Sequence, residues 1–176
     1  MSDLETLLSN PETAGVWNLI PDRSSIGFKN RTLWGLMNVK GKFTEFSGDG
    51  QITGKGAVFG RLDIRAGSVS TGIRKRDEHL RSPDFFDVER FPDISVVVTG
   101  LQHSTGDTAD LRATLTVKGI TLPLTLPSTV RALDDGSVRI TVQTTVDRAK
   151  FDVTGNQLGM LGKTTTLAAD ALFARA

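Results

Sequence analysis

One stretch of the chain, residues 74–92, concentrates the side chains whose types and spacing could do chemistry. It reads RKRDEHLRSPDFFDVERFP and holds one of the chain's two histidines. Asp77, Glu78 and His79 resemble an acid–base or metal-binding cluster, because carboxylates and imidazoles exchange protons and bind metal ions. Adjacent residues on a helix point in different directions, however, so the three side chains do not easily converge on one ion. The spacing favours instead a solvated helix with ion pairs between turns, such as Asp77 with Arg81.

Other motifs for catalysis or cofactor binding are incomplete. The glycine series from Gly48 to Gly56 has its third glycine one residue late for a dinucleotide-binding loop, and strands flank it. Residues 159–164, GMLGKT, end like a phosphate-binding loop but lack its first glycine, and the threonines that follow favour a strand. His103 has no second ligand at metal-binding spacing, and the chain has no cysteine and no G-x-S-x-G. We therefore expect no catalytic residue, no metal site and no cofactor.

Composition is typical of one sheet-rich domain, residues 1–176. The formal net charge of +1 creates no long-range field for nucleic acid or anionic lipid, although a local patch of charge could still attract them. No apolar run approaches the ~18 residues of a membrane span, and the acidic start lacks the features of a signal peptide. We therefore expect a soluble, cytoplasmic protein that does not bind nucleic acid. Asn30-Arg31-Thr32 matches a glycosylation acceptor, which has no meaning without secretion.

Residues 1–14 predict a short helical extension. Ser2 and Glu5 have the spacing of a capping box, and Asn10-Pro11 would end the helix. Its apolar stripe consists of Leu4, Leu7 and Leu8.

From Val16 onward, apolar residues alternate with polar or small ones, as in strands with one buried face. Ser-Gly-Asp-Gly at residues 47–50 predicts a tight hairpin turn. About eight such strands, joined by short turns and not by repeated helices, predict an all-β, antiparallel sandwich or closed up-and-down barrel.

Residues 74–91 are the one long interruption of this pattern and predict a helical crossover. Arg74 to Arg81 would form two helical turns, Ser82-Pro83 would restart the helix, and Pro92 would end it. The phenylalanines within the crossover need burial, so it must pack on the apolar face of the sheet. They are Phe85, Phe86 and Phe91.

The same stretch resembles the signature of the YceI-like family, the polyisoprenoid-binding proteins with a lipocalin-like barrel. The pattern R-x-R-D-x-H-L-R-S-x-D-F-F-D-V-x-x-F-P fits residues 74–92, and weaker pieces such as V-D-R-x-x-F at 146–151 follow in the family's order. The chain departs from that pattern at Arg23 and Asp152, where many members have histidine and glycine. The resemblance implies an antiparallel barrel of about eight strands with a helical crossover. It also implies structural signature residues at Arg76, Asp77, His79 and Leu80.

The resemblance further implies that a polyisoprenoid, or a lipid or quinone with a prenyl tail, occupies the apolar interior. The head group would lie near a mouth lined by Trp34, Leu36, Met37, Met160 and Leu161. The residues predicted to bind the ligand are Phe28, Trp34, Phe43, Val58, Leu62, Ile64, Phe85, Phe86, Val96, Val98, Leu115, Val117, Leu124, Ile140, Val142, Met160 and Phe173.

Three functions are compatible with this barrel. Binding or carriage of the lipid without chemistry is the expected one. An enzyme acting on a bound lipid is the second, with Arg76, Asp77 and His79 as its only polar group. A barrel filled by its own side chains, acting as an interaction module, is the third. Analogy with the family also allows a homodimer.

Overall fold

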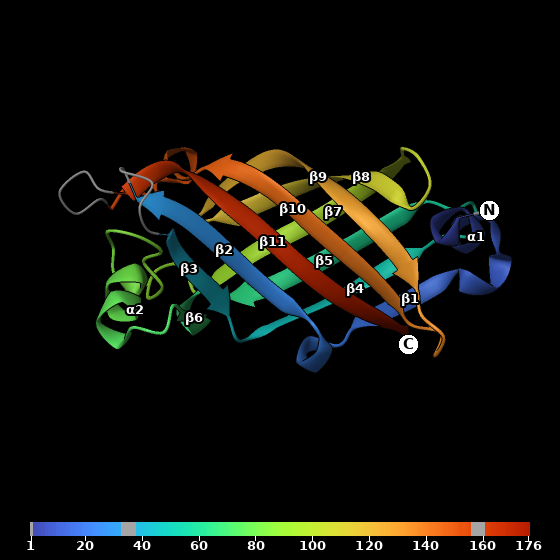
Figure 1. Ribbon diagram of the computed structural model, residues 1–176, viewed down its shortest axis with the longest axis horizontal. Coiled ribbons are helices and arrows are strands. Elements are labelled where there is room, and N and C mark those ends of the chain that lie inside the picture. Colours follow the sequence, from blue (N-terminus) through green and yellow to red (C-terminus); the bar gives the residue numbers. More distant parts are fainter. Residues whose placement is uncertain (1, 33–37, 156–160) are drawn as a thin grey trace.

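The computed structural model describes residues 2–32, 38–155 and 161–176, and strands make up most of them (Figure 1). Its helices are α1 (Asp3–Ser9), α2 (Arg74–Arg81) and four short 3-10 helices, η1 (Pro11–Thr13), η2 (Pro21–Arg23), η3 (Ala66–Ser68) and η4 (Arg148–Phe151). The eleven strands in these residues are β1 (Gly15–Leu19), β2 (Ser25–Thr32), β3 (Asn38–Phe43), β4 (Phe46–Ile52), β5 (Val58–Arg65), β6 (Val69–Ser70), β7 (Asp93–His103), β8 (Thr108–Val117), β9 (Ile120–Ala132), β10 (Val138–Asp147) and β11 (Leu161–Arg175).

The strands form one closed antiparallel barrel. Their order is β1-β4-β5-β7-β8-β9-β10-β11-β2-β3-β6, and β1 also pairs with β11 through Trp17 opposite Arg175 and Leu19 opposite Phe173. In the described residues, three of the eight strand positions are each built from two segments, β1 with β2, β3 with β4 and β5 with β6. The predicted up-and-down barrel of about eight strands is confirmed.

The breaks within these three strand positions have local causes. Pro21 begins η2 between β1 and β2, and proline has no N–H to give to a sheet. Thr44 and Glu45 separate β3 from β4, and the Thr44 backbone N–H donates to Ser68 in η3, which separates β5 from β6. The second and third breaks therefore face each other, and β2, β3 and β6 continue beyond them towards α2 (Figure 1).

The hairpin turn predicted at residues 47–50 is wrong, because these residues lie inside β4. Gly48 is a close-approach residue: a Cβ there would lie 2.7 Å from the carbonyl oxygen of Arg61 on β5. Glycine in a strand often marks such an approach between backbones. The turn comes later, where the Thr53 N–H donates to the Ala57 carbonyl and Gly56 takes a positive φ of 80°.

The crossover is helical only in its first half. α2 spans Arg74–Arg81 as predicted, but the second helical segment is wrong, because successive turns replace it after Ser82. Asp87 has a positive φ of 49°, a backbone conformation that a right-handed helix excludes. Phe85 is nevertheless buried, and Phe86 and Phe91 are half-buried, so the crossover packs onto the barrel although only one of the three phenylalanines is fully covered.

The two α-helices of the described residues lie at opposite ends of the barrel (Figure 1). The predicted capping box of α1 is present, since Glu5 N–H donates to the Ser2 hydroxyl and Ser2 N–H donates to the Glu5 carboxylate. Leu4 and Leu7 are buried against the barrel end, beside Trp17. No helix in the described residues is long and apolar enough to cross a bilayer.

Candidate ligand-binding cavity

The barrel encloses a cavity of about 330 Å³ that extends along its whole length. Its wall begins with Leu4 and Leu7 of α1 and ends with Phe85 and Phe86 of the crossover. A filled protein core leaves few voids larger than a water molecule. Small-molecule sites enclose ~300–1,000 Å³. The interior therefore has room for a ligand.

The wall consists of the inward-facing residues of the alternating strands, and it is almost entirely apolar. Every residue predicted to bind the ligand and described in the structure lies on this wall; contact with a ligand stays a prediction for each. Trp34 and Met160 lie outside the described residues, as do Leu36 and Met37 of the predicted mouth, whereas Leu161 lies on the wall. The wall residues from the prediction are Phe28, Phe43, Val58, Leu62, Ile64, Phe85, Phe86, Val96, Val98, Leu115, Val117, Leu124, Ile140, Val142 and Phe173.

Three aromatic rings gather at the α2 end of the cavity. Phe28 on β2, Phe43 on β3 and Phe86 of the crossover have ring centroids 5.7–6.2 Å apart, in tilted or edge-on orientations. Such pairs stabilise more than their buried area alone. Gly41 faces the Phe28 ring, and a Cβ there would lie 2.3 Å from it, so this glycine makes room for the ring.

Sequence reasoning missed the residues that line the opposite end of the cavity. The leucines of α1 were predicted as a stripe on an extension, not as part of the wall. Alternation could have found the strand residues among them, since they follow the same period as the predicted set. The missed wall residues at this end are Leu4, Leu7, Leu8, Trp17, Leu19, Ile52, Val130 and Val138.

A polar cluster interrupts the apolar wall. Of the buried polar side chains in the described residues, three lie on the cavity wall: Asn30, Arg148 and Thr165. The Thr165 hydroxyl donates to Asn30 Oδ1 at 2.6 Å, and Asn30 Nδ2 donates to the Gly162 carbonyl at 3.0 Å. Arg148 Nε donates to the same carbonyl at 2.9 Å, so one network joins all three side chains.

Arg148 brings a buried positive charge to this network. Its side chain leaves η4, the residue is 8% exposed, and its guanidinium also donates to the carbonyls of Val153, Gly155 and Leu161. Within the described residues no carboxylate forms an ion pair with it. Burial lowers the pKa of Arg148, and the nearby carboxylate of Asp147 partly offsets this. An arginine stays charged in proteins, so the four carbonyl dipoles, helped by the nearby Asp147 carboxylate, stabilise this cation.

This end of the cavity is therefore suited to a polar head group. A guanidinium has five N–H groups, and Arg148 donates four hydrogen bonds to backbone carbonyls. A carbonyl, hydroxyl or phosphate oxygen placed here would meet a positive charge that has no carboxylate partner. The rest of the wall offers almost only hydrocarbon to a ligand.

The ionisable residues of α2 form hydrogen bonds that hold the crossover in place. Asp77 is buried and accepts from Thr71 N–H at 2.8 Å and from the Thr71 hydroxyl at 2.5 Å. Arg76 donates to the same threonine, from Nε to its hydroxyl and from Nη2 to its carbonyl. His79 Nε2 lies 3.0 Å from Asp84 Oδ2, and the ring meets Phe85 edge-on.

The ion pair predicted between Asp77 and Arg81 is wrong. Arg81 donates instead to the carbonyls of Gly67 and Val69, because Asp77 is turned towards the chain before the helix. None of the side chains of Arg76, Asp77 and His79 lies on the cavity wall, whereas Leu80 does. The signature residues thus position the crossover, and one of them contributes to the apolar wall.

Removing the Asp77 carboxylate should destabilise the barrel without changing the cavity. In Asp77→Ala the Thr71 N–H loses its acceptor, which should lower the free energy of unfolding by about 1–3 kcal/mol. Urea denaturation measures this loss. The neighbouring exposed Glu78→Ala is the matched control, with an expected change within about 0.5 kcal/mol. Equal stability of the two variants would contradict the assigned role of Asp77.

Comparison with known proteins places this geometry in a family. The family model described as YceI-like domain matches residues 17–173. A UPF0312 protein of Pseudomonas putida (strain F1) is 41% identical over 69 residues, which are 39% of this chain and 35% of that protein. A UPF0312 protein of Shewanella sp. (strain ANA-3) is 29% identical over 122 residues, 66% of this chain and 63% of that protein. The chain thus spans from about a third to under two thirds of the length of these curated relatives.

Solved structures share the fold. Burkholderia cenocepacia BcnA superposes with a TM-score of 0.79 at 18% identity, covering 89% of this chain and 99% of that one. A polyisoprenoid binding domain from Saccharophagus degradans, implicated in plant cell wall breakdown, superposes with a TM-score of 0.75 at 18% identity, covering 91% and 98%. The family model covers the barrel from β1 into β11, and the crossover carries the signature that the sequence predicted; the chain belongs to the YceI-like domain family.

Proposed function

We propose that this chain binds a polyisoprenoid, or a lipid with a prenyl tail, in the barrel cavity and carries it without changing it chemically. The observation that carries the proposal is the apolar cavity that runs from α1 to the crossover. Membership of the YceI-like domain family supports it, as does the fold shared with a polyisoprenoid binding domain.

The wall explains how such a ligand would be held. Away from the polar cluster the lining is mostly aliphatic and aromatic, and a flexible, branched hydrocarbon needs no fixed polar group from it. Burying an isoprene unit of five carbons contributes on the order of 3–4 kcal/mol gross, at ~0.8 kcal/mol per CH2. Immobilising the tail offsets part of this gain.

The polar cluster gives the ligand a direction. Asn30, Thr165 and Arg148 lie at the end of the cavity near the crossover, whereas the α1 end is lined by leucines and Trp17. We expect the head group, such as a quinone carbonyl or a phosphate, at the polar cluster and the tail towards α1.

Affinity should therefore rise with the number of isoprene units until the cavity is full. Lipid-free protein would be titrated with prenyl alcohols of increasing length, and the fluorescence of the buried Trp17 on the cavity wall would report binding. We expect at least about a tenfold gain for each added unit, after the entropic cost, up to a plateau. Affinity that does not depend on tail length would refute the proposal. Mass spectrometry of the lipid that co-purifies would then identify the natural ligand.

The enzyme alternative is less well supported by the geometry. The only polar residues available for catalysis in that alternative are Arg76, Asp77 and His79. They form hydrogen bonds within and next to the crossover and do not lie on the cavity wall. A modified isoprenoid product that forms with the wild-type chain and not with His79→Ala would nevertheless establish catalysis. The filled-barrel alternative conflicts with a cavity of about 330 Å³. A prenyl quinone as ligand, a homodimer and a cytoplasmic location stay predictions.

A further inference from the structure

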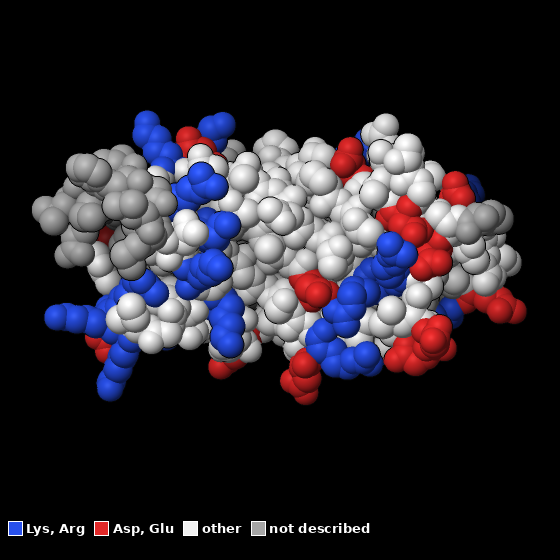
Figure 2. All heavy atoms as spheres, viewed as in Figure 1, with Lys and Arg blue, Asp and Glu red and all other residues white. Residues whose placement is uncertain are grey.

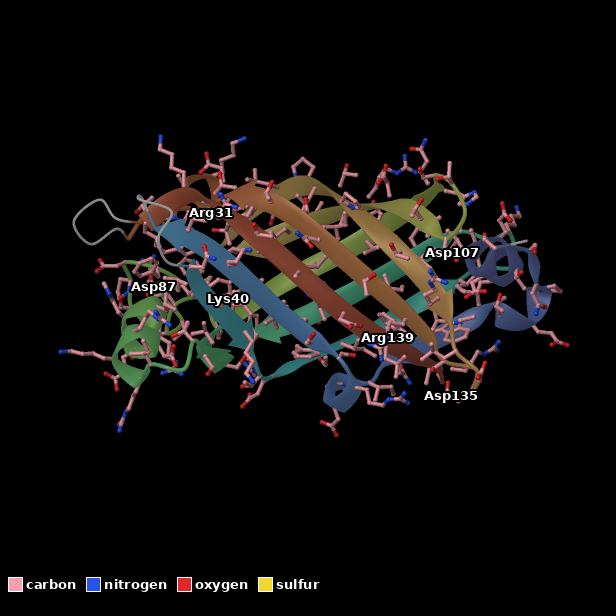
Figure 3. All side chains as sticks on the ribbon, viewed as in Figure 1. Arg31, Lys40, Asp87, Asp107, Asp135 and Arg139 are labelled. Carbon is pink, nitrogen blue, oxygen red and sulfur yellow. The ribbon has the colours of Figure 1, made fainter. Side chains whose placement is uncertain are left out.

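Four cations lie on the outer surface of β2 and β3. They form a basic patch, defined as Lys29, Arg31, Lys40 and Lys42. Figure 2 shows Lys and Arg gathered in a column across this part of the molecule, next to a broad surface with few charges. Figure 3 places Arg31 and Lys40 at the end of the barrel near α2.

The strand register shows that no acidic residue balances the basic patch from a neighbouring strand. Lys29 lies directly opposite Lys40, and on its other side it faces Thr166 of β11. The remaining partners are also uncharged: Asn38 for Arg31, and Gly27 and Ser70 for Lys42. Among the described residues, none of the four cations forms an ion pair. Like charges directly opposite each other destabilise a sheet, so folding alone does not favour this arrangement.

Cations towards the α1 end are arranged differently. There Arg139 pairs with Asp170, Arg23 with Asp135, and Arg131 with Asp107. Figure 3 shows Arg139, Asp135 and Asp107 in this half of the molecule, away from Arg31 and Lys40. The formal net charge of the whole chain is only +1, so acidic residues elsewhere in the chain offset the four cations of the patch.

The basic patch covers the outside of the wall whose inside carries the polar cluster. Asn30, between Lys29 and Arg31 on β2, is buried and lies on the cavity wall. Nearby, three residues after Ser70, Ile73 is 52% exposed, the most exposed large apolar residue among the described residues. Positive charge, an exposed apolar side chain and the polar end of the cavity thus occur together.

We propose that the basic patch docks this end of the barrel on an anionic lipid bilayer. Each Lys or Arg near an anionic membrane surface raises partitioning about fivefold, so four unpaired cations provide substantial affinity. An apolar cargo is poorly soluble in water and resides in bilayers. Docking therefore brings the polar end of the cavity to the bilayer from which the cargo would be taken up. Only this purpose rests on the proposed function; the docking itself is measured separately. The phosphates of a nucleic acid could bind the same cations. An exposed Ile73 and an apolar cargo, however, would have no role in binding nucleic acid.

Vesicle co-sedimentation tests the docking. The full chain would be mixed with vesicles of phosphatidylcholine alone, or with vesicles in which phosphatidylglycerol replaces a third of the lipid. We expect the wild-type chain to bind only the anionic vesicles, and salt to weaken binding. Lys29→Gln/Lys40→Gln should lower the partition coefficient at least about tenfold. The control Lys55→Gln/Arg112→Gln changes the net charge equally, at exposed residues of the β4–β5 turn and of β8, and should retain binding within about twofold.

Three outcomes would overturn the inference. Equal binding to both kinds of vesicle would show that lipid charge has no role in docking. An equal fall of the partition coefficient in the two double variants would show that binding depends on the total charge of the chain and not on the basic patch. Stronger binding to a single-stranded polynucleotide than to vesicles, with the same dependence on Lys29 and Lys40, would assign the patch to nucleic acid. The cavity-filling variant Ala169→Trp separates the two proposals, since it should dock normally yet take up no prenyl ligand. Docking without prenyl binding in the wild-type chain would contradict the proposed function alone, and prenyl binding without docking would contradict this inference alone.

Discussion

Ala169→Trp is expected to abolish uptake of a prenyl ligand while the barrel stays folded. Ala169 lies in the middle of β11, opposite Val142 on one side and Ile26 on the other, and its side chain lines the cavity. An indole placed there would occupy the space of the tail. Affinity should fall at least roughly a hundredfold, because each excluded isoprene unit removes about 3–4 kcal/mol of gross burial.

The existing void makes this substitution tolerable. Enlarging a side chain in a filled core costs about 1–3 kcal/mol, but here the indole enters a cavity of about 330 Å³. Titration with a long prenyl alcohol measures the loss, and urea denaturation measures stability. Gln143→Trp is the control, because Gln143 is exposed on the outer surface of neighbouring β10 and should leave affinity unchanged. Undiminished affinity in a folded Ala169→Trp protein would place the ligand outside the barrel.

Arg148→Met should weaken both the barrel and its selectivity for a head group. Methionine keeps an apolar stem but removes the four hydrogen bonds that Arg148 donates to backbone carbonyls, those of Val153, Gly155, Leu161 and Gly162; the Gly162 carbonyl still accepts from Asn30. Removing a buried, multiply bonded group should lower the free energy of unfolding by about 3–5 kcal/mol, which urea denaturation measures.

The effect on selectivity separates the charge of Arg148 from its structural role. A charge-assisted hydrogen bond contributes about 1.5–3 kcal/mol, so a prenyl phosphate should lose about tenfold or more in affinity relative to the plain prenyl hydrocarbon. Arg148→Lys keeps the charge but donates fewer hydrogen bonds. This variant should retain the preference for phosphate even where stability falls. If the phosphate and the hydrocarbon lose affinity equally in Arg148→Met and in Arg148→Lys, the polar cluster only shapes the barrel.

Strand alternation predicted the apolar wall well, for a physical reason. A barrel has one inner face, so a period of two assigns each residue to the inside or the outside with no knowledge of its partners. Val96 and Val98 on β7, and Leu115 and Val117 on β8, therefore lie on the wall where the pattern placed them. The crossover was recognisable because its signature is specific, although its charges suggested chemistry that the contacts do not support.

The polar cluster could not be predicted in the same way. Asn30 and Thr165 are brought together by the pairing of β2 with β11, and Arg148 joins them through the carbonyl of Gly162. Such contacts depend on register between distant segments. In the sequence, Asn30 resembled only a glycosylation acceptor.

The missed turns had competing local causes. Residues 47–50 have the composition of a turn, but in β4 the glycines serve close packing against β5. After Ser82, cap-like chemistry predicted a second helix, yet Asp87 adopts a left-handed conformation and its N–H donates back to the Ser82 carbonyl. Asp tolerates that conformation more readily than most residues.

The pairing of β1 with β11 has a consequence for how the protein folds. It joins Trp17 and Leu19 to Arg175 and Phe173, from segments far apart in the chain, and contacts of such long sequence separation form slowly. Until these contacts and the equally distant pairs between β2 and β11 form, the barrel is an open trough whose apolar lining is exposed and prone to aggregation. A lipid that binds only the closed barrel shifts the equilibrium towards it by mass action. The cargo would thus act as a folding aid, and the yield of folded protein would depend on the supply of lipid during synthesis.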